Sequence, residues 1–132
     1  MLVNFPIAFL TGAFAADLAW LATGDAFWIR AVYWLILAGL TIGAVAALGG
    51  LAELLLVPHA RKSRLGWTHG LLNLAALSLA AWNLALRDGG EPSELAIVLS
   101  GAVTLMLAAS SWLGGEMTFR HGVGASGGGH KS

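Results

Sequence analysis

Apolar residues dominate four long stretches of the chain, and short polar segments separate them. The stretches cover about residues 5–22, 31–57, 67–86 and 95–119. At 1.5 Å per residue the first is about 27 Å long, close to the roughly 30 Å hydrocarbon core of a bilayer. The pattern therefore predicts an all-α fold: an integral membrane four-helix transmembrane bundle, antiparallel and up-down-up-down, with both termini on the same side.

Residues that end and start helices stand between these stretches. Gly24 follows the first stretch, Pro58 ends the second, and Pro92 or Ser93 lies near the start of the fourth. Residues 123–132 are rich in glycine and are expected to form a flexible tail. We therefore expect a single domain over residues 1–122.

The composition agrees with a membrane protein. Hydrophobic residues make up 58% of the chain and charged residues 11%, and the mean hydropathy is +0.78. Seven basic and seven acidic residues balance, which gives no basic surface for nucleic acid. The chain has no cysteine, which excludes disulfides, thiolate metal sites, iron–sulfur clusters and haem attached through cysteine. The lipid bilayer is thus the first expected partner.

The basic residues predict an orientation. Threading four spans puts five of the seven on the side of both termini: Arg61, Lys62, Arg64, Arg120 and Lys131. By the positive-inside rule we expect an inner (cytoplasmic) membrane protein with cytoplasmic N- and C-termini. No basic stretch precedes the first apolar run, so we expect that run to remain as a helix and not to be a cleaved signal.

Two helices carry polar or small residues that should face the bundle. Asp17, inside the first stretch, needs a partner there, and Arg30 and Arg87 lie on its side of the membrane. In the second stretch, the spacing of Gly39 and Gly43 is that of closely packed membrane helices. Gly49, Gly50 and Glu53 lie on the same face of this helix as these small residues. This placement predicts that Glu53 faces the bundle.

The third stretch carries His69, Asn73 and Asn83 on one face lined with alanines. Lipid offers these groups no hydrogen bonds, so that face should point at protein or at a ligand. Glu53, Glu116 and His121 lie toward the same end of the bundle as His69. We therefore expect a polar cluster of His, Glu and Asn residues at the cytoplasmic end.

Four motifs carry a resemblance to a family. They are VNFPIAF near Asn4, GGLAELLLVP around Glu53, GWTHGLLNLAAL from Gly66 and WLGGEMTFRHGVG at the end of the fourth stretch. Together they resemble the uncharacterised bacterial membrane family known as domain of unknown function 2231, over residues 2–124. Glu53, His69, Asn73, Glu116 and His121 stand at positions that the family's motifs share, whereas Asn4 stands where the family usually has His. Members joined to Rieske-type or cytochrome c domains imply a link to electron transfer.

We expect a small redox-associated or assembly subunit of a membrane complex, and not a free-standing enzyme. In this interpretation the polar cluster fixes the helices in register and docks a partner, either a larger redox complex or a second copy. His69 is then a hydrogen-bonding residue paired with Asn73 or Glu53.

Two hypotheses give the cluster a cofactor. In the first, His69 and His121 are axial ligands of a haem b, and Asn73 or Glu53 orients His69. In the second, a metal ion binds between helices through carboxylates and imidazoles: Glu53, His69, Glu116 and His121. A path for protons or ions is disfavoured, because the carboxylates do not run across the membrane.

Overall fold

The computed structural model describes residues 2–121, with side chains up to residue 116. These residues form five helices: α1 (Asn4–Thr23), α2 (Ala26–Leu56), α3 (Pro58–Arg61), α4 (Arg64–Ala85) and α5 (Glu94–His121). Four of them are long, and α3 is a short helix of four residues. The described part of the chain contains no strand, so the all-α prediction is confirmed for it. The expected glycine-rich tail lies outside the described residues.

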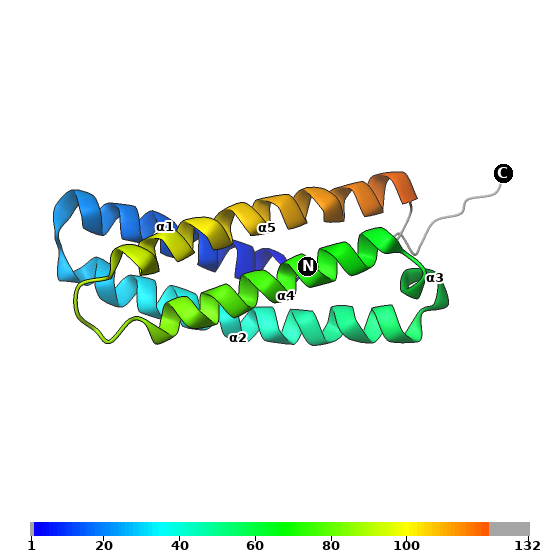
Figure 1. Ribbon diagram of the computed structural model, residues 1–132, viewed down its shortest axis with the longest axis horizontal. Coiled ribbons are helices and arrows are strands. Elements are labelled where there is room, and N and C mark those ends of the chain that lie inside the picture. The colour runs from blue at the N-terminus through cyan, green and yellow to red at the C-terminus, as the bar shows by residue number, and fades with distance from the viewer. Residues whose placement is uncertain (1, 122–132) are drawn as a thin grey trace.

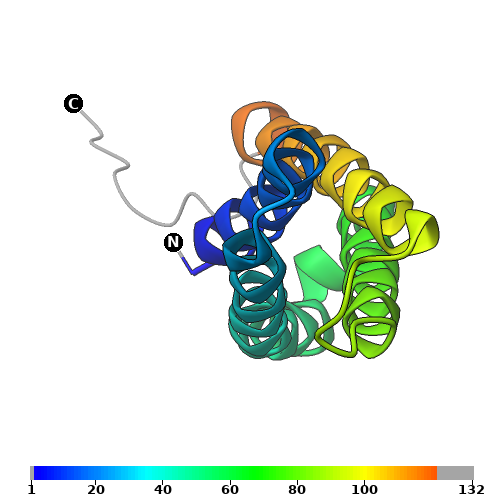
Figure 2. The same ribbon diagram turned by 90° about the vertical axis from the view of Figure 1, so that its left-hand side faces the viewer.

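The four long helices form a ring in the order α1, α2, α4, α5 (Figures 1 and 2). Each runs opposite to its neighbours in the ring. The α1–α2 and α4–α5 connections, residues 24–25 and 86–93, lie together at one end, which we call the loop end. Residues 57–63, which include α3, lie at the other end, which we call the α3 end.

Local hydrogen bonds set the helix ends. Gly24 has a φ of 67°, a left-handed conformation that suits glycine, and it closes the two-residue turn between α1 and α2. The Asp25 carboxylate accepts a 2.8 Å bond from the second backbone N–H of α2. The Ser63 and Ser93 hydroxyls cap α4 and α5 at 3.1 and 3.2 Å. The prediction that α5 starts near Ser93 is thus confirmed.

Small side chains in the core let the helices approach one another closely. A Cβ on Gly39 would lie 2.7 Å from the Cγ atom of Leu10, and one on Gly43 would lie 2.6 Å from a methyl carbon of Leu77. Alanines and branched residues fill the centre of the bundle: Leu10, Ala13, Ala16, Val32, Ile36, Ala76, Ala80, Val103 and Leu107. The prediction of tight packing at the first two glycines of α2 is therefore confirmed.

The first helix is shorter than α2 and leaves part of the bundle uncovered. Pro6, in the first turn of α1, lies beside Gly43. Leu77 of α4 packs against the same position of α2. α2 therefore continues to Leu56 beyond the start of α1, and α4 packs beside it there. Figure 1 shows the N-terminus well short of the α3 end.

We call this uncovered part the open section, residues 46–56, 64–74 and 112–116. Gly49 and Gly50 of α2 are exposed there and would have free space around a Cβ, and Glu53 is exposed. The prediction that these three residues face the bundle is wrong. The prediction assumed that another helix covers this face along all of α2, whereas α1 reaches only to about the level of residue 45 of α2.

Within the described part of the chain, three helices are long and apolar enough to cross a membrane: α1, α2 and residues Glu94–Glu116 of α5. The fourth expected span, α4, is not among them. His69, Asn73 and Asn83 are strongly polar and lower its hydropathy. The outer surface nevertheless carries large apolar side chains, including Leu48 at 69% exposure and Leu105 at 74%, as expected for helices that face lipid.

The glycine contacts generate a stability prediction. Gly39→Leu should lower the free energy of unfolding by about 1–3 kcal/mol, because the buried Leu10 has no room to move. Gly50→Leu is the matched control, since it enters free space on the same helix and should leave stability unchanged. Unfolding in mixed detergent micelles, followed by circular dichroism, measures both. Equal effects would contradict the assigned α1–α2 contact.

Candidate functional site

Polar side chains inside the bundle gather in two clusters, one toward each end. The ion-pair cluster, toward the loop end, consists of Asp17, Asn83, Arg87 and Ser100. The histidine cluster, toward the α3 end, consists of His69, Asn73 and Ser110. Every buried side-chain nitrogen and oxygen atom of the described residues has a hydrogen-bond partner, as burial away from water requires.

A bidentate ion pair forms the centre of the first cluster. Arg87, two residues after the end of α4, reaches across the bundle to Asp17 on α1. Its Nη1 and Nη2 atoms donate to the two carboxylate oxygens at 2.9 and 2.7 Å. The two side chains are 4% and 0% exposed. Of the two partners predicted for Asp17, Arg87 is confirmed, and this geometry is the strongest that an arginine offers a carboxylate.

Two neutral side chains complete the ion-pair cluster. The Nε atom of Arg87 donates to Asn83 at 3.0 Å, and its Nη2 atom donates to the Ser100 hydroxyl at 3.3 Å. Asn83 in turn donates to the same hydroxyl at 2.7 Å. Four of the five guanidinium N–H bonds are thus used. The cluster joins α1, α4 and α5 and compensates both buried charges.

The second cluster holds the His69 ring between α4 and α5. The Nδ1 atom lies 2.9 Å from both the carbonyl oxygen and the hydroxyl oxygen of Ser110. The Nε2 atom lies 3.1 Å from the Asn73 amide nitrogen, which also donates to the His69 carbonyl at 3.0 Å. A Cβ on Gly114 would lie 3.3 Å from the ring, so this glycine lets the ring pack against α5.

These contacts determine where the neutral ring carries its proton. The Ser110 carbonyl only accepts, so the Nδ1 atom of His69 must carry the proton and donate it. The Asn73 amide nitrogen only donates, so the Nε2 atom must be the acceptor. Ser110 and His69 are close enough for a nucleophile and its base, but a protonated Nδ1 atom accepts no proton from the hydroxyl. The arrangement suits a structural role.

The other predicted site residues do not all join the histidine cluster. Glu53 is exposed, and its carboxylate makes no hydrogen bond or ion pair with any described residue, so the predicted contact of His69 is confirmed for Asn73 and not for Glu53. Glu116 is half-buried and has a partner. The side chain of His121 lies outside the described residues.

Both cofactor hypotheses stay predictions. Among the described residues no three His, Asp or Glu side chains meet as metal ligands. His69 has no free ring nitrogen in this arrangement, so the ring does not fit an axial haem ligand unless the bond from Asn73 is broken.

Sequence reasoning did not assign a role to Ser100 or Ser110. Serines are common on membrane helices, and their hydroxyls usually bond to the backbone of their own helix. The antiparallel order of α4 and α5 contained one signal for the contact between His69 and Ser110. Pairing Asn83 with Ser100 puts residue 69 opposite residue 114, one turn from Ser110.

The buried ion pair generates a second prediction. Asp17→Leu and Arg87→Leu should each lower the free energy of unfolding by about 3–5 kcal/mol, because each leaves one buried charge without a partner. The double variant should be more stable than either single variant. Chemical unfolding in micelles measures the cycle.

Arg30→Leu is the control for this cycle, since Arg30 was the other candidate partner of Asp17 and is exposed. It should change stability little. Additive losses in the double variant would show that the two charges do not interact.

A third prediction concerns the His69 tautomer. In ¹⁵N NMR spectra of the neutral ring, the Nδ1 atom should carry the proton and the Nε2 atom should not. The Ser110 carbonyl requires a donor at the Nδ1 atom, and the His69 carbonyl orients the Asn73 amide nitrogen as a donor to the Nε2 atom. Asn73→Leu removes the bond to the Nε2 atom and should shift that resonance alone. A proton on the Nε2 atom of the unaltered protein would contradict the geometry.

A family model matches a region of the chain that includes both clusters. The family described as predicted membrane protein (DUF2231) matches residues 1–127, which confirms the resemblance inferred from the motifs. No curated protein and no solved structure matches the chain. The chain is therefore a multi-pass membrane protein with three candidate spans, and it belongs to the DUF2231 family of predicted membrane proteins.

Proposed function

We propose that this protein is an assembly subunit of a membrane complex and that its open section receives a transmembrane helix of a partner protein. The observation that carries the proposal is the position of the start of α1: its first turn lies beside Gly43, and no described residue covers Gly49 and Gly50 further along α2. The resemblance to proteins joined to Rieske-type or cytochrome c domains makes redox complexes the first partners to test.

The surface of the open section supports a helix as its occupant. Gly49 and Gly50 have free space where a Cβ would stand, so a second backbone has room to approach α2 closely. A large apolar residue lies next to them on the same helix: Leu51, which is 47% exposed. A face of this kind is typical of contacts between membrane helices.

Glu53 supports a partner that carries a positive charge. Its carboxylate is exposed next to apolar side chains and has no hydrogen bond or ion pair within the described residues. A carboxylate at a lipid-facing position is costly unless it is paired. A lysine or arginine on the partner helix, at the level of Glu53, would compensate it.

In this proposal α4 is a fourth span in spite of its lower hydropathy. Its polar side chains His69, Asn73 and Asn83 make their hydrogen bonds inside the bundle. Its outward side chains include Leu71 at 62% and Leu74 at 59% exposure. Its cost in lipid is thus lower than its composition indicates.

We propose that the α3 end lies in the cytoplasm, together with both termini. The exposed basic residues Arg61, Lys62 and Arg64 lie at that end, whereas the exposed residues at the loop end include four acidic ones: Asp25, Asp88, Glu91 and Glu94. The positive-inside rule favours this orientation.

A photo-crosslinking amino acid at position 50 tests the proposal in native membranes. It should give a product with one other protein, whose crosslinked segment is a membrane helix with a lysine or arginine. The same amino acid at position 48 is the matched control, because residues 48 and 50 stand about 200° of helix rotation apart at the same depth. Glu53→Gln should lower the yield about tenfold if one charge pair of about 1.4 kcal/mol is lost.

Mass spectrometry of the products decides between occupants. A heteromeric product from position 50 and not from position 48 supports the proposal. A product that contains two copies of this chain, or adducts with lipid alone, would contradict it.

A further inference from the structure

Three basic residues at the α3 end lie on one short segment of the chain. Arg61 is the last residue of α3, Lys62 follows it, and Arg64 is the first residue of α4. Consecutive Cα atoms are about 3.8 Å apart, so the Cα atoms of Arg61 and Arg64 lie within about 11 Å of each other. That distance is close to the Debye length of about 10 Å at 0.1 M ionic strength. The three charges therefore act together on the same small area of a facing surface.

The described part of the chain does not compensate these charges. Arg61, Lys62 and Arg64 are exposed, and their side chains make no hydrogen bond or ion pair with a described residue. The described residues contain one ion pair, which joins Arg87 and Asp17 inside the bundle. The three basic side chains are therefore available to an external anion.

Hydrogen bonds hold the segment that carries the charges. The indole N–H of Trp67 donates to the Arg61 carbonyl at 3.0 Å. The backbone N–H of Ser63 donates to the Ala60 carbonyl at 3.0 Å, and the Ser63 hydroxyl accepts from the backbone N–H of Gly66 at 3.1 Å. Ala60 is buried. The backbone of the segment is thus fixed to the bundle, while its charged side chains extend into the surroundings.

Exposed apolar side chains adjoin the basic ones. Leu56 is 79% exposed, and Val57 and Trp67 are about half as exposed. α2 is a candidate membrane span and ends at Leu56, so the basic segment begins directly after the end of a span. Tryptophan is enriched at membrane–water interfaces. Apolar residues next to basic ones suit the boundary between acyl chains and headgroups better than they suit a soluble partner.

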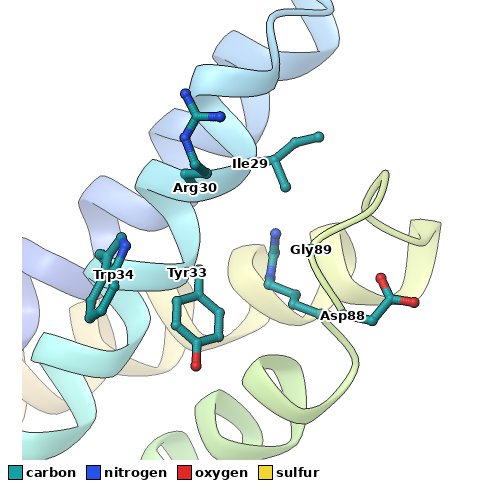
Figure 3. A pocket seen from close by; sticks show the side chains of 7 residues that line it. Ile29, Arg30, Tyr33, Trp34, Asp88 and Gly89 are labelled. Atoms are coloured by element: carbon teal, nitrogen blue, oxygen red, sulfur yellow. The ribbon is translucent and has the colours of Figure 1, made fainter.

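The loop end lacks this excess of positive charge. Its exposed basic residue, Arg30, lies at a cavity opposite Asp88, and Figure 3 shows the two charged groups pointing away from each other. Arg87 is paired with Asp17. The exposed acidic residues at the loop end outnumber Arg30: Asp25, Asp88, Glu91 and Glu94. Anionic headgroups should therefore gather at the α3 end and not at the loop end.

We propose that Arg61, Lys62 and Arg64 form a docking surface for anionic phospholipids. The lipid phosphates lie against the three basic side chains, and Trp67 lies at the interface beside them. The attraction depends on charge, so phosphatidylglycerol and phosphatidylserine bind this surface equally well. The proposal depends on the location of the chain in a membrane and does not depend on the partner helix proposed above.

Lipid crosslinking tests the docking surface. The full chain is reconstituted in nanodiscs of equal parts phosphatidylglycerol and phosphatidylcholine, each lipid in turn carrying a photoactivatable group near its headgroup. Mass spectrometry then locates the crosslinks. At residues 56–67 we expect phosphatidylglycerol to exceed phosphatidylcholine at least fivefold, about the effect of one basic residue near an anionic surface. The loop end should show no such excess. The triple variant Arg61→Gln, Lys62→Gln and Arg64→Gln should lower the ratio at residues 56–67 to about one.

Two controls accompany the triple variant. Arg30→Gln removes an exposed charge at the loop end and should leave the ratio at residues 56–67 unchanged. Raising the ionic strength from about 0.1 M to 1 M shortens the Debye length from about 10 Å to 3 Å. The ratio should then fall in the unaltered chain, which tests the charge effect without any substitution.

Several results would overturn the proposal. One is a ratio near one in the unaltered chain at low salt, and another is a ratio that persists both in the triple variant and at high salt. An excess of phosphatidylglycerol that phosphatidylserine does not share would show recognition of a particular headgroup instead of charge. If residues 56–67 crosslink to neither lipid, they face water or a protein. Crosslinking at position 50, which tests the partner helix, is read separately from all of these.

Discussion

The ion pair between Arg87 and Asp17 is the interaction on which the rest of the bundle depends. Both side chains are almost fully removed from solvent, and neither lipid nor the apolar core can replace the lost hydration. Their attraction is effective because the geometry is bidentate and because Asn83 and Ser100 accept from two of the three other N–H groups of Arg87. The pair links α1 to the α4–α5 half of the ring. The other contacts between α1 and this half are small and apolar.

The two ends of the bundle provide partners for their buried polar groups in different ways. At the loop end a charged network joins three helices. Toward the α3 end His69, Asn73 and Ser110 join only two, because α1 does not reach that level. The structure thus combines a closed half, where polar groups are satisfied within the chain, with an uncovered half whose Glu53 is not. This asymmetry supports the proposal that the closed half provides stability and the uncovered half provides contact.

Much of the fold follows from local patterns in the sequence. Apolar runs separated by glycine, proline and capping serines predict the long helices, and the isolation of Asp17 in an apolar run predicts a basic partner on its side of the membrane. The family resemblance was also recognisable from short motifs such as WTHGLLN.

The interpretations that the structure corrects share one cause: a sequence pattern describes one helix at a time and does not place its neighbours. Glu53 was assigned to the interior because a helical wheel gives a direction but says nothing about whether a neighbour is present at that depth. The partnership of Ser110 with His69 depends on the register between α4 and α5, which side-chain packing sets and periodicity alone does not. Hydropathy does not count α4 as a candidate span, and a sum over residues does not include hydrogen bonds made to other helices, such as that from Asn83 to Ser100.

The two-residue turn at Gly24 and Asp25 has a consequence for biogenesis. It makes α1 and α2 a helical hairpin that is complete in the chain before α4 and α5 are synthesised. Until Arg87 has been synthesised, the Asp17 carboxylate lacks the guanidinium that pairs with it in the complete bundle, and Arg30 is the only basic residue of the first hairpin. A chain that ends before α4 therefore carries an acidic group within its apolar hairpin that Arg87 does not yet compensate.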